Sequence, residues 1–153
     1  MERDFQETVI EINRISKKTK GGNQIRFSAL VVVGDKKGGV GVGLSKAPNV
    51  VSAIRKAITQ ARKNMVKIPL KGTTIPFSVR VKYGAARVML KPARPGSGVV
   101  AGGPLRAVFE SAGVKDIVAK ILGTNNKTSN LYATIEAVRM LNGLLEVQKE
   151  VVL

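Results

Sequence analysis

The sequence predicts an α+β protein built from two small domains. Several short segments alternate apolar and polar residues with a period of two, which is typical of strands, and two longer segments follow a helical period. A segment with Gly and Pro, KGTTIP, separates the elements into two groups. Because 153 residues suffice for one ordinary domain or two very small ones, we expect domains at residues 1–70 and 71–153.

The first domain is expected to contain three strands, a helix and a fourth short strand. A β-branched strand, ETVIEINRI, is followed by a polar loop, SKKTKGGN. The next strand, QIRFSALVVVGD, places Ile25, Phe27, Ala29 and Val31 on one face. A glycine-containing hairpin turn, DKKGG, leads into a third strand, VGVGLS, and the short strand VKIPL ends the unit.

The helix of the first domain is predicted over residues 47–65, with Asn49 as its N-cap. Its apolar stripe consists of Val50, Ile54, Ala57, Ile58, Ala61 and Met65. The opposite side carries four basic residues, for which we expect no acidic partner: Arg55, Lys56, Arg62 and Lys63.

The second domain is expected to have the order β-β-α-β-α. The strands PFSVRVKYG and ARVMLKPA flank a turn at YGAA. A Gly/Pro-rich loop, RPGSGVVAGGP, precedes a short helix, LRAVFESAG, that ends at Gly113, and KDIVAKILG is a strand. The last helix, within TNNKTSNLYATIEAVRML, is expected to be capped between Thr128 and Asn130. Its inward residues are Leu131, Ile135, Val138 and Leu141.

Charge is the strongest functional signal in the composition. The chain has 26 basic and 10 acidic residues, a net charge of +16 and a pI near 10.6. Between Ile12 and Phe109 there are 20 Lys or Arg residues and a single acid, Asp35. Such a field suggests a polyanionic partner, and nucleic acid is favoured over a membrane surface or a merely solvated basic face.

Other classes of protein have little support in the sequence. The N-terminus lacks the features of a signal peptide, and no apolar run approaches the roughly 20 residues of a membrane span; we expect a soluble intracellular protein. The chain has no Cys and no His, so thiolate chemistry, a Ser-His-Asp triad and a His metal site are excluded. With few carboxylates near its glycines, the chain is predicted not to be an enzyme and to need no cofactor.

Two glycine-rich segments resemble ligand-binding motifs. In GGVGVGLSK, neither the P-loop spacing nor the dinucleotide-binding spacing is met, so we interpret it as a close-packed strand. In PGSGVVAGGPLRAV, glycines before a helix could offer amides to an anion. There are three alternatives for this segment. It could approach a protein or RNA closely, bind a nucleotide phosphate as in a small-molecule kinase, or be a simple flexible loop.

The polar loop after the first strand is the strongest candidate binding site. Lys and Arg neutralise phosphates, and the aromatic residues are too few, at four Phe and two Tyr, to suggest base stacking. We therefore predict recognition of folded RNA through phosphates and shape. The predicted RNA-binding residues on the loop and the rest of the first domain are Arg14, Lys17, Lys18, Lys20, Gly21, Gly22, Arg26, Lys36, Lys37, Lys46, Arg55, Lys56, Arg62 and Lys63.

Several segments resemble family five of the small-subunit ribosomal proteins (S-five, bacterial type). They are residues 20–65, the block AGGPLRAVFESAGVKDIVAKILGTNN and the segment ATIEAVRML, in the right order over roughly residues 8–142. The resemblance implies an N-terminal domain like double-stranded-RNA-binding modules and a second domain with a left-handed β-α-β crossover. It implies a structural constituent of the small subunit that helps assembly, decoding accuracy, and entry and unwinding of messenger RNA.

The resemblance also implies partners and places. These are small-subunit (16S-type) ribosomal RNA, the small-subunit proteins four and eight, and messenger RNA near Arg14, on cytoplasmic or organellar ribosomes. Ser16 joins the basic loop as an RNA-binding residue near the spectinomycin site. The implied protein interface comprises Gly96, Gly98, Gly102, Gly103 and Arg106.

Three features depart from the family pattern: Arg94 and Pro95 in PARPG, Tyr132 in place of Arg, and a short C-terminal tail. A free-standing RNA-binding protein or RNA chaperone is the main alternative function, and a nucleotide-binding kinase is the weaker one.

Overall fold

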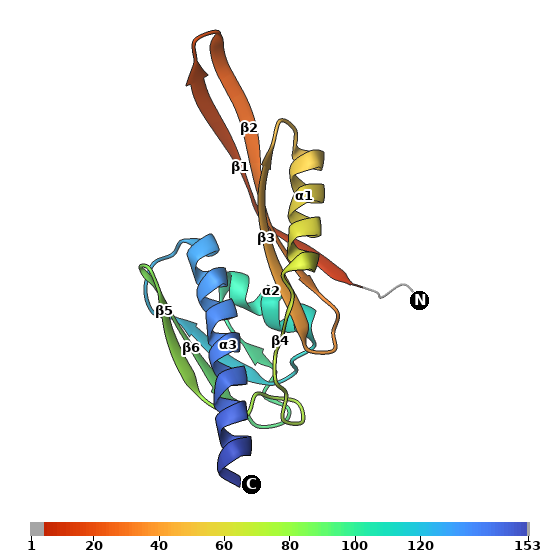
Figure 1. Cartoon of the computed structure of the whole chain (residues 1–153), viewed down its shortest axis with the longest axis vertical. Coiled ribbons are helices and arrows are strands. Elements are labelled where there is room, and N and C mark those ends of the chain that lie inside the picture. The colour runs from red at the N-terminus through yellow and green to blue at the C-terminus, as the bar shows by residue number, and fades with distance from the viewer. Residues whose placement is uncertain (1–4, 153) are drawn as a thin grey trace.

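The computed structural model describes residues 5–152, with side chains up to Gln148 (Figure 1). Two four-stranded sheets and three helices form an α+β structure. The first group of elements is β1 (Gln6–Thr19), β2 (Gly22–Gly34), β3 (Gly39–Ala47), α1 (Val50–Lys63) and β4 (Val66–Lys67). The second group is β5 (Val79–Tyr83), β6 (Ala86–Pro92), β7 (Val99–Val100), α2 (Gly103–Ala112), β8 (Ile117–Ile121) and α3 (Lys127–Val152).

The first sheet has the order β1-β2-β3-β4 with all neighbours antiparallel. Helix α1 covers the face that carries Phe27, Ala29 and Val31, as the period-two pattern predicted. Asn49 caps α1 by accepting a hydrogen bond from the Ser52 amide at 2.8 Å, which confirms the predicted N-cap.

The glycines of β3 allow α1 to approach the sheet closely. A Cβ atom at Gly41 or Gly43 would collide with the carbonyl oxygens of Ala61 or Ala57 in α1. The buried residues of α1 are correspondingly the small ones, Ala53, Ala57 and Ala61. This confirms that GGVGVGLSK is a close-packed strand.

The second sheet has the order β5-β6-β8-β7, with β7 parallel to β8 and the other pairs antiparallel. The predicted strand and helix order is confirmed except for β7, which is two residues long and lies in the Gly/Pro-rich segment interpreted as a loop. A two-residue strand is too short to show alternation. Gly113 ends α2 in the left-handed conformation, as predicted.

The last helix differs from the prediction at both ends. Its first turn is capped by Asn126, whose side chain accepts from the Ser129 amide at 3.0 Å, rather than by a residue between Thr128 and Asn130. The helix also continues to Val152 instead of ending near Leu141. The predicted inward residues Leu131, Ile135, Val138 and Leu141 are all buried. None of the helices in residues 5–152 is long and apolar enough to cross a membrane.

Helix α2 joins the two sheets. It contacts β2 of the first sheet on the face opposite α1, where Leu30 and Val32 share a core cluster with Phe109. The Lys36 amide donates to the Ser111 carbonyl at 3.0 Å, and the Gly38 amide donates to the Ala112 carbonyl at 2.8 Å. The first sheet is therefore buried on both faces where it meets the rest of the molecule.

Candidate nucleic-acid interface

The segment expected to be a polar loop is a two-stranded ribbon. Strand β1 continues to Thr19, and β2 begins at Gly22, so a two-residue turn at Lys20 and Gly21 replaces the loop SKKTKGGN. The loop prediction was wrong because Ser, Lys and Asn have weak strand propensity, whereas pairing across the ribbon extends a register set deeper in the sheet. We call residues 14–26 the basic ribbon.

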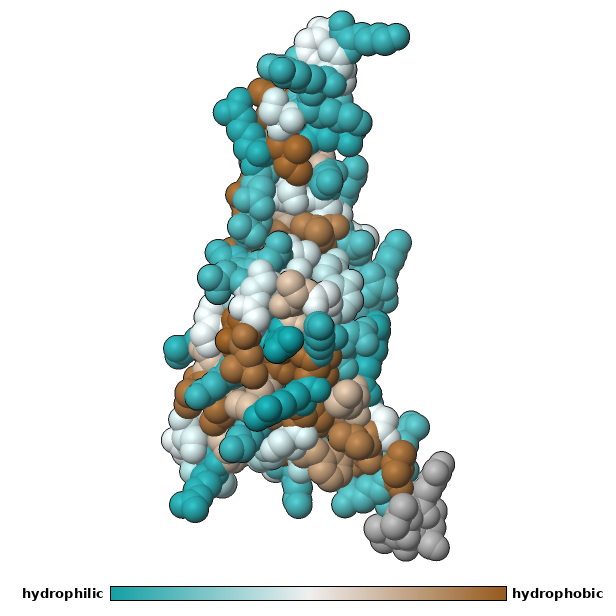
Figure 2. Space-filling view, turned by 90° about the vertical axis from the view of Figure 1, so that its left-hand side faces the viewer, coloured by the Kyte–Doolittle hydropathy of each residue, from teal (hydrophilic) through white to brown (hydrophobic). Residues whose placement is uncertain are grey.

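The basic ribbon projects away from the body of the protein. Strand β3 pairs with β2 only as far as Phe27, so the five residues from Gly22 to Arg26 pair with β1 alone over roughly 17 Å, at about 3.4 Å per residue. Figure 1 shows this hairpin extending past α1. On the side seen in Figure 2, its surface is mainly hydrophilic.

The register spreads positive charge over both faces of the ribbon. Arg14 lies opposite Phe27, and Lys18 lies opposite Asn23, on the α1 side of the sheet. Lys17 lies opposite Gln24 on the other face, where Arg26 is paired with Ile15. Lys20 occupies the turn, so no side of the ribbon tip is without a cation. The described part of the ribbon contains no carboxylate.

The turn at the tip explains the glycine at position 22. Gly22 has a φ of 125°, a backbone conformation that residues with a Cβ atom rarely adopt. The Thr19 hydroxyl donates to the Gly22 carbonyl at 2.7 Å and closes the turn. Gly22 therefore helps to shape a tight hairpin, and the segment is not a flexible loop. Ser16 is exposed on this ribbon opposite Ile25.

Helix α1 supplies a second basic surface next to β3. A hollow of about 480 Å³, open to solvent, is lined by Ser45, Arg55, Lys56, Thr59, Gln60 and Lys63. Gln60 accepts a hydrogen bond from the Leu44 amide at 2.8 Å, which ties the helix to the edge of β3. Three cations and several polar groups in one open hollow suit phosphate oxygens.

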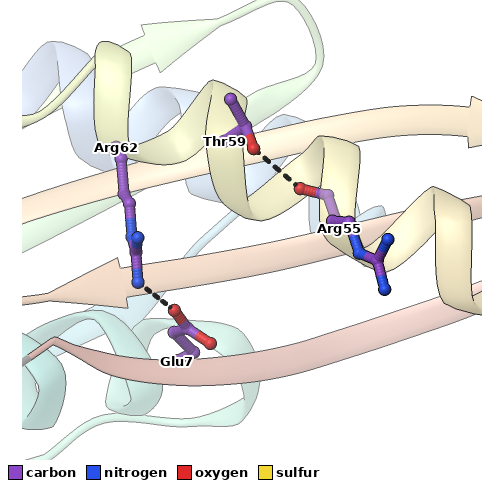
Figure 3. Close-up of polar contacts among 4 residues, drawn as sticks. All are labelled: Glu7, Arg55, Thr59 and Arg62. Carbon is purple, nitrogen blue, oxygen red and sulfur yellow. Dashed lines mark hydrogen bonds and ion pairs between the residues drawn. The ribbon is translucent and has the colours of Figure 1, made fainter.

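One predicted RNA-binding residue of this helix has a partner within the protein. Arg62 forms an ion pair with Glu7 of β1 at 2.6 Å between nitrogen and oxygen (Figure 3). Its guanidinium also lies 5.1 Å from the centre of the Phe5 ring. The expectation that this side of the helix lacks an acidic partner was wrong for Arg62, because only the folded sheet brings residue 7 beside residue 62.

The other predicted cations are not gathered in one place. Lys36 and Lys37 lie in the β2–β3 turn, at the opposite end of β2 from the ribbon tip. Asp35 shapes this turn by accepting from the Lys37 and Gly39 amides, both at 2.8 Å. Lys46 is exposed on β3 opposite Ser28, near the base of the ribbon.

The second glycine-rich segment is held by a buried carboxylate. Asp116, only 4% exposed, accepts hydrogen bonds from the amides of Gly96 at 3.1 Å and Gly98 at 2.9 Å. Hydrogen bonds from the Thr73 side chain and then from these amides hold the pKa of Asp116 below its ordinary value of 3.8, although burial acts to raise it. The anion at these amides is the protein's own, which argues against a nucleotide phosphate there.

The remaining predicted interface residues lie at the start of α2. Gly102 is the N-cap and Gly103 has a φ of 53°, and neither Cβ position would meet an atom within 4 Å. Arg106 is exposed and pairs with Glu110 at 2.8 Å, one helical turn away. Asp116 was not predicted, because its only signal in the sequence is an isolated acid in a basic region.

One departure from the family pattern has a structural role. Tyr132 of α3 packs against Tyr83 of β5 with ring centres 5.8 Å apart. Burial, and to a lesser extent Tyr83, raises the pKa of the Tyr132 hydroxyl. An aromatic pair therefore connects α3 with β5 at the position where the resemblance implied an Arg.

Comparison with known proteins identifies the family. Residues 5–69 match the N-terminal domain of ribosomal protein S5, and residues 81–151 match its C-terminal domain. The chain belongs to the ribosomal protein S5 family. Small ribosomal subunit protein uS5 from Campylobacter jejuni strain 81-176 is 51% identical over 140 residues, which is 92% of this chain and 95% of the relative. The same protein from strain RM1221 has the same identity and coverage.

Membership in the S5 family confirms the resemblance seen in the sequence. The two matched S5 domains correspond to the antiparallel sheet with α1 and to the mixed sheet with α2 and α3. The family is one of ribosomal proteins and not of enzymes.

Proposed function

We propose that this protein is a structural constituent of the small ribosomal subunit that binds small-subunit ribosomal RNA through the basic ribbon and α1. The observation that carries the proposal is the ribbon itself, in which five cations and no carboxylate lie on a hairpin paired only with itself at its tip. A two-stranded hairpin is at best marginally stable in water. Phosphates would supply both the missing charge and a surface that holds the ribbon in place.

The mode of RNA recognition follows from the side chains on offer. The aromatic ring at the base of the ribbon, Phe27, packs into the α1 core instead of facing solvent as a stacking platform. Lys and Arg contacts to phosphate position a protein on RNA without reading its bases. Shape and charge are therefore the basis of binding at the ribbon, and the hollow beside α1 offers a second set of phosphate contacts.

The loop tied to Asp116 supports a separate role in protein contacts. By family resemblance, we propose that Gly96, Gly98, Gly102, Gly103 and Arg106 face small-subunit protein four, that protein eight is a further neighbour, and that Arg14 approaches messenger RNA. A loop with fixed geometry offers a partner a preformed surface. Gly98 has a φ of 77°, so a Gly98→Val variant should lose docking to protein four while nearly keeping its affinity for isolated RNA. Equal losses of both would contradict this assignment.

Two further assignments belong to the same proposal. We place the protein on cytoplasmic ribosomes, and we divide the chain into domains at residues 70 and 71. This division of the chain stays a prediction. Leu30 and Val32 of the first domain share a core with Phe109 of the second, so independent folding of the first domain would be strong support for the division.

Sedimentation of a native lysate at moderate salt tests the proposed function. A ribosomal constituent should co-migrate with small subunits and resist a salt wash that strips loosely bound basic proteins. Presence only in light fractions would contradict the proposal. Equal affinity for unrelated RNAs in that case would indicate a free-standing RNA chaperone.

A further inference from the structure

The second sheet has a basic outer face that neither helix covers. Helices α2 and α3 pack on its inner face, where Val79, Leu90 and Ala119 are buried in the core. The strand registers then fix the outer face as well, because side chains alternate along each strand. Arg80, Met89 and Lys120 form one row across β5, β6 and β8.

Two more rows complete the outer face. Lys82 lies directly opposite Arg87, and Lys91, Val118 and Val100 form the row toward β7. The five basic residues of these rows are all exposed, and Val100 is 53% exposed. We call this surface the outer sheet face: Arg80, Lys82, Arg87, Met89, Lys91, Val100, Val118 and Lys120.

The described acids lie elsewhere in this half of the molecule. Glu110 pairs with Arg106 on α2, and Asp116 is buried beneath the glycine-rich loop. Glu136 and Glu146 belong to α3, which packs on the inner face. Among residues 5–148, no ion pair involves any of the five cations of the outer sheet face.

This arrangement carries an electrostatic cost in the isolated protein. Side chains directly opposite each other in an antiparallel pair have Cβ atoms about 4.5 to 5.5 Å apart, and like charges at such positions are destabilising. Lys82 and Arg87 occupy such a pair. A polyanion laid across the sheet at this pair would offset the repulsion.

The spread of charge indicates which polyanion fits. The cations lie across three adjacent strands, and the apolar residues among them are Met89, Val100 and Val118, with no aromatic residue. The core of a stable protein interface is usually apolar and depleted of Lys, whereas three of the five cations on this face are Lys. Five exposed cations without an ion-pair partner among residues 5–148 suit a phosphate backbone better.

We propose that the outer sheet face is a second RNA-backbone contact, separate in space from the basic ribbon. This inference rests on the proposed RNA-binding function and adds a surface in the second half of the chain. The protein would then hold ribosomal RNA at two ends, with the rigid joint at α2 fixing the distance between them.

Three double variants with the same change of net charge test this inference. They are K82Q with K120Q on the outer sheet face, K17Q with K20Q on the basic ribbon, and K67Q with K127Q as the matched control. Lys67 and Lys127 are exposed and lie on neither proposed surface. The probe is a transcript of Campylobacter jejuni small-subunit ribosomal RNA, and the dissociation constant is measured as a function of KCl concentration.

The outer-face pair and the ribbon pair should each reduce the magnitude of the slope of log K against log [KCl] by about 1.5. Each phosphate contact contributes about 0.7 to 0.9 to this slope, and each double variant removes two contacts. The control pair should leave the slope unchanged. The melting temperature of the outer-face variant should not fall, because losing Lys82 relieves its repulsion with Arg87, and this excludes misfolding as the cause of weaker binding.

The other outcomes separate the two proposals. An outer-face pair that behaves as the control, beside a ribbon pair that reduces the slope, would overturn the second contact and leave the proposed function standing. No reduction from either pair would remove the RNA-binding function itself. An outer-face pair with unchanged RNA binding but weaker incorporation into small subunits would overturn the inference in favour of an acidic protein partner.

Discussion

Strand β2 is exposed from Gly22 to Arg26 and buried from Ser28 to Gly34, although it pairs with β1 along its whole length. The inner half has α1 on one face and α2 on the other, so both of its faces lie in hydrophobic clusters. The outer half has only its partner strand. The same hydrogen-bonded ladder thus belongs to the core in one half and to a projecting charged surface in the other.

This difference shows what each half needs in order to be ordered. Apolar burial contributes about 25 cal/mol per Å² and stabilises the inner half without any partner. The outer half buries little, and Ile25 is 40% exposed. Its order depends on its own ladder and, in the proposed function, on RNA. Substitutions in the inner half should therefore change stability, and those in the outer half should change binding.

The largest expected effect is a loss of folding stability when a methyl group is added to β3, next to the buried half of β2. A Gly43→Ala substitution places Cβ against the Ala57 carbonyl of α1, so the helix must move off the sheet. We expect a loss of about 3 kcal/mol in the free energy of unfolding, measured by urea denaturation. Gly21→Ala is the control, because a Cβ at Gly21 meets no atom within 4 Å. Equal losses in both variants would contradict the comparison.

A smaller loss of stability is expected at the buried carboxylate. In Asp116→Asn, the amides of Gly96 and Gly98 lose a charged acceptor, so the melting temperature should fall by several degrees at pH 7. Because the folded-state pKa of Asp116 is lowered, its contribution is complete above the ordinary value of 3.8 and is lost as pH falls through the folded-state pKa. The difference between the two proteins should shrink in that acidic range. A constant difference would show that the charge is not the cause.

Substitutions in the outer half should leave stability unchanged and weaken binding. Lys17→Gln alone should shift the melting temperature little, because the side chain is exposed. Its salt slope for ribosomal RNA should fall by about 0.8. The check is a pair of measurements on one sample, thermal unfolding and RNA affinity at several salt concentrations. A marked fall in melting temperature would mean that the ribbon supports the core.

The smallest expected effect separates two cations of α1. Arg62 is already paired with Glu7, and both side chains are partly exposed, at 50% and 34%. Arg62→Gln should cost about 0.5 kcal/mol of stability and reduce the salt slope by less than Arg55→Gln, which removes a cation lining the open hollow. The comparison uses the same RNA titration for both variants. Equal reductions in slope would mean that RNA displaces Glu7 from Arg62.

Much of the fold could be predicted because it depends on local periodicity. The alternation in QIRFSALVVVGD placed Phe27, Ala29 and Val31 on one face, which the structure shows to be the α1 side, and the helical stripe of α3 gave its buried residues. Residues 16–23 of the ribbon were mistaken for a loop because they are polar on both faces, so no alternation marks them as strand. β7 was missed because two residues cannot show a period.

The candidate site divides in the same way. The sequence by itself determined the excess of positive charge, its concentration between Ile12 and Phe109 and the family to which the chain belongs, because these depend on residue identity and order. Only the tertiary structure decided that Glu7 forms an ion pair with Arg62 and that Asp116 accepts hydrogen bonds from the amides of the glycine-rich loop. It also decided that five cations share one sheet face. In each case, strand register and helix packing bring together residues that are far apart in the sequence. No local pattern of residues encodes such a contact.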